Sequence, residues 1–131
     1  MAAKQKKTIK KTAPQKVEKG KIYISSSFNN TLVTVTDFDG NTLVWSSSGN
    51  AGFKGTRRAT PFAATTAVDK IIKSAKEKHE LKEVDIYIKG PGPGRDAALR
   101  AIRAAGLKIS MIADLTPIPH NGPRPKKKRH V

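Results

Sequence analysis

The sequence contains no cysteine, few aromatic residues, few acidic residues and no long apolar run. Without cysteine, a disulfide framework, a thiolate metal site and a thiol nucleophile are excluded. No stretch approaches the roughly 20 apolar residues of a membrane-spanning helix, so we expect no membrane partner. Aromatic residues make up 5% of the chain, which disfavours a protein that binds single strands by base stacking. The three histidines lack clustered carboxylate neighbours, which predicts solvated positions, and we expect no metal and no cofactor.

Positive charge is in excess: 26 Lys and Arg residues face 10 Asp and Glu residues, a formal net charge of +16 over 131 residues. Residues 1–21 carry +7 and residues 120–131 carry +5, which leaves +4 for the segment between them. This distribution predicts a disordered basic arm over 1–20, one folded domain over 21–116 and a proline-rich basic finger over 117–131. An excess of this size predicts a polyanionic partner.

The spacing of apolar residues predicts five strands and two helices in the order βββαβαβ. Asn29-Asn30, which tolerates the left-handed conformation, and Asp39-Gly40 predict tight turns between the first three strands. Thr60-Pro61 predicts the start of the first helix, and Gly106 the end of the second. The strands are expected at 22–28, 31–36, 42–46, 84–88 and 107–112, and the helices at 61–79 and 95–105.

These elements predict an α/β fold, a mixed five-stranded sheet with two helices packed on it. Phe28 and Trp45 are assigned to its core or to a sheet face, in preference to base stacking.

The loop over 46–60 combines three glycines with Lys54, Arg57 and Arg58. Glycines let backbone N–H groups approach phosphate, and nearby cations neutralise its charge, so we expect contact with an RNA backbone. A nucleotide-binding P-loop is excluded because it needs Gly-Lys-Ser/Thr, whereas the order here is Lys54-Gly55-Thr56. A solvated loop with glycines at its turns is the alternative.

Gly90-Pro91-Gly92-Pro93-Gly94 leads into the second predicted helix. A helix N-terminus offers unpaired N–H groups to an anion. A rigid corner between strand and helix fits the same spacing. Three arginines that follow favour phosphate: Arg95, Arg100 and Arg103.

The C-terminal segment is stiffened by prolines and carries five cations. Prolines lower the entropy lost on docking, which favours a finger inserted between RNA helices over a loose tail that aids solubility. The predicted contacts are Arg124, Lys126, Lys127, Lys128 and Arg129. Asn121-Gly122 at the root of the finger is a candidate for deamidation, because glycine leaves the Asn side-chain carbonyl open to attack by the next backbone nitrogen.

Five longer motifs follow one another in the chain, at residues 26–31, 45–58, 60–64, 89–95 and 114–122. Together they resemble the universal family of small-subunit ribosomal protein eleven, from about residue 21 to the C-terminus. His120-Asn121-Gly122 resembles the bacterial or organellar branch. Pro123 and Lys126 depart from the usual bacterial ending, and this affects the expected path of the finger but not the family.

The resemblance implies a ribonuclease-H-like fold and a structural role in the small (30S) ribosomal subunit, in the cytoplasm. It implies binding to central-domain 16S ribosomal RNA on the platform, beside the cleft for the Shine–Dalgarno region of the mRNA. Ribosomal proteins seven, eighteen and twenty-one would be neighbours, with no homo-oligomer. It also adds Asn29, Asn30 and Asn121 to the expected rRNA contacts.

A nuclease is the main rival, because ribonuclease-H enzymes hold two metal ions with carboxylates on the first strand and at later strand ends. The first predicted strand here has no carboxylate, and Asp37, Asp39 and Asp85 form no clustered pair. We therefore expect no enzyme activity. A nucleoid DNA-binding protein is a second rival, weakened by the absence of a helix-turn-helix signature.

Overall fold

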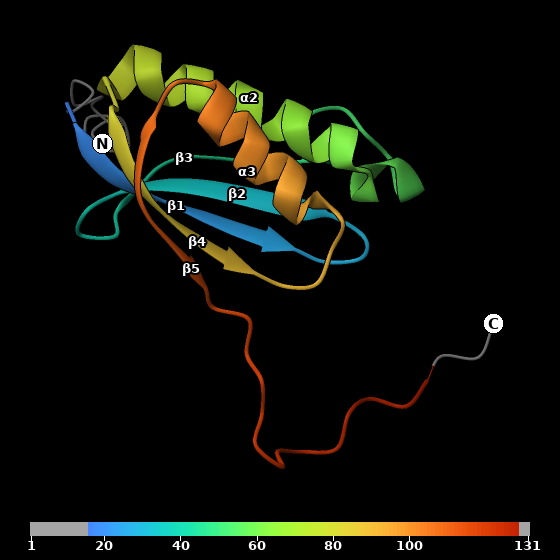
Figure 1. Cartoon of the computed structure of the whole chain (residues 1–131). Coiled ribbons are helices and arrows are strands. Elements are labelled where there is room, and N and C mark those ends of the chain that lie inside the picture. Colours follow the sequence, from blue (N-terminus) through green and yellow to red (C-terminus); the bar gives the residue numbers. More distant parts are fainter. Residues whose placement is uncertain (1–15, 129–131) are drawn as a thin grey trace, which may run out of the picture.

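The computed structural model describes residues 16–128 and contains an α/β domain (Figure 1). Residues 1–15 of the predicted basic arm, and Arg129 of the predicted finger, lie outside the described residues. The elements are, in chain order, β1 (Lys19–Ser26), β2 (Thr31–Asp37), β3 (Thr42–Ser47), the 3-10 helix η2 (Gly55–Ala59), α2 (Pro61–His79), β4 (Glu83–Lys89), α3 (Gly94–Ala104) and β5 (Lys108–Asp114). The predicted order of strands and helices is confirmed.

The five strands form one mixed sheet in the order β3-β2-β1-β4-β5. β1, β2 and β3 pair antiparallel as a meander, while β4 lies parallel to β1 and β5 lies parallel to β4. Both helices cover the same face of this sheet (Figure 1). The opposite face carries no helix in the described part of the chain.

The core lies between the sheet and the two helices. Alternate residues of the central strands point into it, among them Ile22 and Ile24 of β1 and Ile86 of β4. Helix α2 contributes residues at helical spacing such as Val68 and Ile71. The periods of 2 and 3.6 residues in the sequence therefore correspond to the buried faces of strands and helices.

Helix α2 begins and ends where the sequence predicts. The Thr60 hydroxyl accepts a hydrogen bond from the Ala63 backbone N–H at 3.2 Å, and Pro61 occupies the first turn. Helix α3 is followed by Gly106 at φ +86, a left-handed conformation that glycine adopts without strain. Both helix ends are thus encoded locally.

Strand β1 begins at Lys19, three residues before the start that the sequence predicts. Parallel pairing with β4 begins at Lys19, opposite Glu83, and extends the strand in that direction. At the other end, the Ser27 N–H donates to the Asn30 carbonyl at 2.8 Å, and this closes a turn that contains Phe28. Phe28 is 72% exposed, so its assignment to the core or to a sheet face is wrong.

Trp45 lies on a face of the sheet, which is one of the two positions predicted for it. This is the face away from the helices, and the side chain is 62% exposed. The solvated position predicted for His79 is wrong, because this residue ends α2 and is buried. Its backbone carbonyl accepts a hydrogen bond from the Val17 N–H at 2.8 Å. Val17 in turn lies against the core, ahead of the first strand.

Candidate nucleic-acid interface

Four strands end at the same edge of the sheet, which we call the carboxyl edge. β1, β4 and β5 run parallel, and β3 runs in the same direction because β2 is antiparallel to both β1 and β3. The segments that follow these strands are the turn 27–30, the loop 48–60, the corner 90–94 and the extended segment 115–128. Three of them contain predicted RNA-binding residues, and the corner leads directly to Arg95, so the topology gathers parts of the chain that are distant in sequence.

Backbone hydrogen bonds join these segments to one another. The Ser48 N–H donates to the Thr31 carbonyl at 3.0 Å, which links the loop 48–60 to the strand that follows the turn 27–30. The Gly92 N–H donates to the Ser26 carbonyl at 3.0 Å, which links the corner to the end of β1. The carboxyl edge is therefore one connected surface.

The loop 48–60 places its cations on and beside η2, a 3-10 helix within the glycine-rich loop that the sequence predicts. Lys54 immediately precedes η2, and Arg57 and Arg58 lie within it. Lys54 and Arg57 are exposed, while Arg58 is half-buried and donates from Nε to the Gly55 carbonyl at 3.2 Å. No residue of η2 is buried and residues 46–60 include no acid, so the positive potential faces solvent.

Asn29 and Asn30 lie in the turn between β1 and β2. Neither adopts the left-handed conformation that their sequence suggests, since among the described non-glycine residues only Glu80 and Asn121 have positive φ. Instead, the Ser27 hydroxyl accepts hydrogen bonds from both asparagine N–H groups, at 3.2 and 3.1 Å. The Asn30 side-chain oxygen accepts from the Thr31 N–H, whereas the Asn29 side chain is exposed.

The corner 90–94 is packed tightly against the end of β1. A Cβ at Gly92 would collide with the Ser27 carbonyl oxygen, and one at Gly94 would collide with the buried Thr31 hydroxyl. Both glycines are buried, and Asp96 brings a negative charge to the first turn of α3. This geometry favours the rigid corner over an anion site at the start of the helix.

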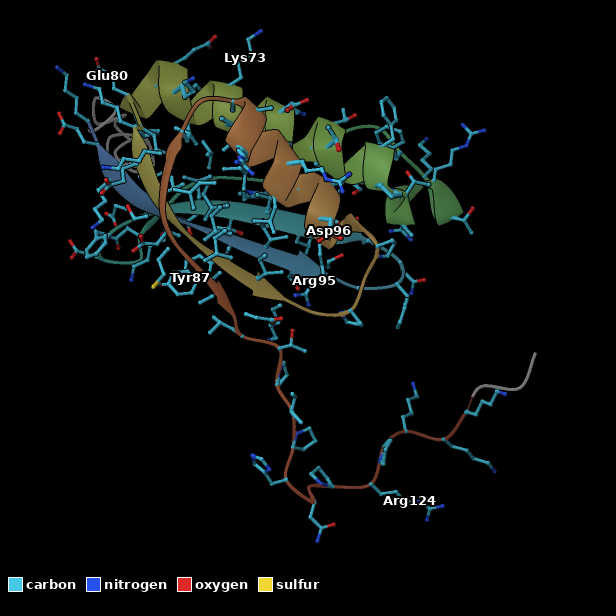
Figure 2. The ribbon with its side chains drawn as sticks, in the orientation of Figure 1. Lys73, Glu80, Tyr87, Arg95, Asp96 and Arg124 are labelled. Atoms are coloured by element: carbon cyan, nitrogen blue, oxygen red, sulfur yellow. The ribbon has the colours of Figure 1, made fainter. Side chains whose placement is uncertain are left out.

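Arg95 joins the corner to the root of the C-terminal segment (Figure 2). Its guanidinium donates to the Gly90 carbonyl at 2.6 Å and to the Asp114 carboxylate at 2.6 Å. The Thr116 hydroxyl donates to the same carboxylate at 2.6 Å and accepts from the Gly90 N–H at 3.1 Å. Hydrogen bonds from Arg95, and then from Thr116, hold the pKa of Asp114 well below its usual range.

Arg100 and Arg103 lie further along α3 and are exposed. Arg100 lines a hollow of about 390 Å³ between α2 and α3, which Phe62 also lines. At a helical rise of about 1.5 Å per residue, Arg103 lies roughly 12 Å along the axis from Arg95. The carboxyl edge therefore includes the start of α3 but not its last turn.

Beyond Thr116 the chain extends away from the domain (Figure 1), and Figure 2 shows Arg124 far from the sheet and helices. Arg124, Lys126, Lys127 and Lys128 are exposed along this segment. Asn121 is exposed with φ +61. The predicted finger thus starts at the carboxyl edge and carries its cations outward.

Sequence reasoning assigned no role to the sheet face opposite the helices. There, Tyr23 and Tyr87 stack with ring centroids 5.1 Å apart, and the ammonium groups of Lys19 and Lys21 lie 4.9 and 5.1 Å from the centroid of the Phe38 ring. The sequence signal for this face was the alternation along β1: because Tyr23 lies between the core residues Ile22 and Ile24, its side chain must point to the opposite face.

Among residues 16–128 we find no group of three or more His, Asp or Glu side chains placed to hold a metal ion. Within the same range, no helix has both the length and the apolar character to cross a membrane. Asp85 of β4, one of the acids weighed for a nuclease, is buried.

A small α/β domain with cations gathered at one edge of its sheet, and with a basic extended segment leaving that edge, belongs to the class of polyanion-binding proteins. Residues 20–130 match the family model described as Ribosomal protein S11. Two curated relatives, each called small ribosomal subunit protein uS11, come from Caldicellulosiruptor saccharolyticus and Caldicellulosiruptor bescii. Each is 50% identical to this chain over 131 residues, covering all of both sequences.

The chain belongs to the ribosomal protein S11 family, a family of structural proteins of the small ribosomal subunit and not of enzymes.

Proposed function

We propose that this protein is a structural constituent of the small (30S) ribosomal subunit that binds central-domain 16S rRNA through its carboxyl edge and its C-terminal finger. The observation that carries the proposal is the convergence of four separate segments at one edge, with η2 and the finger both cationic and exposed. Family membership supplies the ribosomal context. As part of the ribosome, the protein would lie in the cytoplasm, the location expected from the sequence.

The resemblance noted in the sequence supports a position on the platform of the subunit. There the protein would lie beside ribosomal proteins seven, eighteen and twenty-one and help to form the cleft that receives the Shine–Dalgarno duplex. The rigid corner 90–94 would fix the direction in which the finger leaves the domain, through the contacts of Arg95 with Asp114. The finger would then reach RNA that the domain itself does not touch.

The test compares two pairs of substitutions that remove the same charge. Arg57 and Arg58 lie at the carboxyl edge, whereas Lys73 and Lys78 are exposed on α2, where Figure 2 shows Lys73 on the side away from the sheet. We expect R57A/R58A to weaken binding to a transcript of the 16S central domain and to reduce incorporation into small subunits. K73A/K78A should leave both nearly unchanged.

Equal losses from both pairs would indicate that charge alone drives binding, and would contradict a defined surface. Equal affinity for duplex DNA of matched length would favour the nucleoid-protein alternative. Thermal midpoints measured on all variants separate loss of binding from loss of folding.

A further inference from the structure

The face of the sheet opposite the helices carries a row of side chains that the fold leaves uncovered. Strand register aligns Trp45 of β3 with Thr34 of β2, Thr34 with Tyr23 of β1, and Tyr23 with Tyr87 of β4. Figure 2 shows Tyr87 on the side of the sheet away from both helices. We call this row the open sheet face.

The aromatic residues of this row are accessible. Trp45 is 62% exposed and Tyr23 is 36% exposed, although large aromatic side chains usually find cover. Tyr87 supports Tyr23 from the far side, since their rings lie nearly parallel at 16° with centroids 5.1 Å apart. Tyr23 is therefore held as one ring of a preformed stack, with its other side toward Thr34.

The space above Thr34 matches a short stack of planar rings. Tyr23 and Trp45 stand on strands separated by β2, which puts their backbones roughly 10 Å apart at about 4.8 Å per strand. Thr34 between them is small and half-buried. Two nucleobases stacked between two rings need three stacking distances of roughly 3.4 Å each, about 10 Å in total, so two consecutive bases fit between these strands.

Charge on and around the open sheet face is positive. Lys21 lies two residues from Tyr23 on the same face, with its ammonium 5.9 Å from the centroid of the Tyr87 ring. Lys89, opposite Ser25, is exposed on this face at the carboxyl edge. Two acids of β4 share this face: Asp85 is buried, and Glu83 is half-buried with its carboxylate 3.6 Å from the ammonium groups of both Lys19 and Lys108. Near Trp45, Lys70 lines a hollow of about 280 Å³ at the β3 edge.

We propose that the open sheet face binds two consecutive unpaired nucleotides of RNA, with their bases between Tyr23 and Trp45 and their phosphates toward Lys21 and Lys89. The inference rests on the proposed function, because it makes this face a continuation of the carboxyl edge. RNA is favoured over a protein partner by the two lysines of this face, Lys21 half-buried and Lys89 exposed, and by the finger, which leaves the domain on this side of the sheet (Figure 1).

The single tryptophan of the chain reports directly on this site, because Trp45 is the only source of indole fluorescence. The full-length protein is titrated with a single-stranded oligoadenylate of eight nucleotides and with an RNA duplex of equal total charge, and anisotropy of end-labelled RNA measures binding separately. We expect saturable quenching of Trp45 by the single strand and little quenching by the duplex. Binding of the single strand without quenching would overturn the inference and leave the proposed function intact. No binding of either RNA would also overturn the inference, while the 16S central-domain transcript tests the proposed function separately.

Substitutions separate stacking from apolar contact. We expect W45L to weaken binding to the 16S central-domain transcript by about 5- to 150-fold, the range measured for stacked bases, with an unchanged salt dependence. W45F should keep most of the wild-type affinity, because phenylalanine can also stack. L32A is the matched control, because Leu32 is 47% exposed on the same sheet face but cannot stack.

Equal losses in W45L and L32A, or no loss in either, would overturn the stacking site. If W45L binds the transcript normally but is lost from assembled subunits, the face docks another protein and the inference is wrong. Circular dichroism confirms that each variant is folded before binding is measured.

Discussion

At the scale of single residues, Arg95 combines two roles: it positions the finger, and it is a proposed phosphate contact. Its guanidinium is bound to Gly90, Asp114 and Thr116 in the free protein. A phosphate that approached Arg95 would compete with these contacts or bind the outer side of the same group. Arg95 is therefore first a positioning residue for the finger, and the phosphate contact proposed for it would add to that role.

Replacing Asp114 with Asn should loosen the root of the finger without unfolding the domain. We expect hydrogen exchange at the Gly90, Leu115 and Thr116 amides to accelerate by about twofold to fivefold, the size expected for an exposed ion pair. Exchange at Ile86 in the core should not change. D96N removes the same charge from the first turn of α3 and is the control. Equal effects of both variants would mean that the Arg95 contact does not hold the root.

The Arg95–Asp114 contact should respond only to acid. The pKa of Asp114 is lower in the folded protein than in the unfolded chain, where an aspartate titrates near about 3.9. The stabilisation is thus complete above the unfolded value and is lost as the pH falls through the folded value. Exchange protection at Leu115 should stay constant from pH 7 to about pH 4 after correction for intrinsic rates. A loss of protection near pH 6 would contradict this assignment.

Asn121 should convert to aspartate and isoaspartate in the free protein. The residue is exposed with φ +61, and Gly122 carries no side chain of its own to hinder its backbone nitrogen as that nitrogen attacks the Asn121 side-chain carbonyl. Docking of the finger on rRNA should slow the reaction by fixing the backbone. Peptide mass spectrometry on aged free protein and aged ribosomes, with isoaspartyl-methyltransferase labelling, measures both rates. Equal conversion in the two samples would remove the protective role of docking.

At the scale of elements, the start of β1 determines how much of the N-terminal segment can be removed. Val17 lies against the core, and Lys19 and Gly20 pair with β4. Gly20 is buried where a Cβ would stand 2.6 Å from the Thr36 carbonyl oxygen, so the strand cannot accept a larger residue there.

Deleting residues 1–15 should leave the circular dichroism spectrum and the thermal midpoint nearly unchanged while weakening RNA binding, because it removes five lysines and no acid. Deleting residues 1–20 should lower the thermal midpoint clearly, because it also removes Val17 and the first two residues of β1. Thermal melts of both truncations against the full chain provide the measurement. Equal midpoints for the two truncations would mean that residues 16–20 add nothing to the fold.

At the scale of the whole molecule, 12 of the 16 excess positive charges lie in residues 1–21 and 120–131. Binding should therefore be driven largely by phosphate neutralisation, with RNA shape selecting the site. The logarithm of the affinity for the 16S central domain should fall steeply with the logarithm of salt, by roughly 0.7 to 0.9 per phosphate neutralised. Deleting residues 1–15 should reduce the slope by up to about 4. A flat response to salt would contradict this mechanism.

The sequence alone determined the order of the elements, the ends of α2, the end of α3 and the identity of the basic segments. These features are local: Thr60 and Pro61 start a helix through their own hydrogen bonding and φ, and Gly106 ends one for the same reason. Alternation along β1 likewise fixed which residues are buried, because a strand has a period of two wherever it lies. The motifs that identified the family are also linear.

The tertiary structure decided what depends on pairing between distant segments. The bounds of β1 follow from its register with β4, which places Lys19 opposite Glu83 and leaves Phe28 in a turn. The partner of Arg95 is Asp114, 19 residues away, and no spacing rule connects them. Trp45 is exposed because both helices cover the other face of the sheet, a choice made by the crossover connections and not by the composition of β3. Local chemistry therefore specified the elements, and long-range packing specified which surfaces remain free to bind.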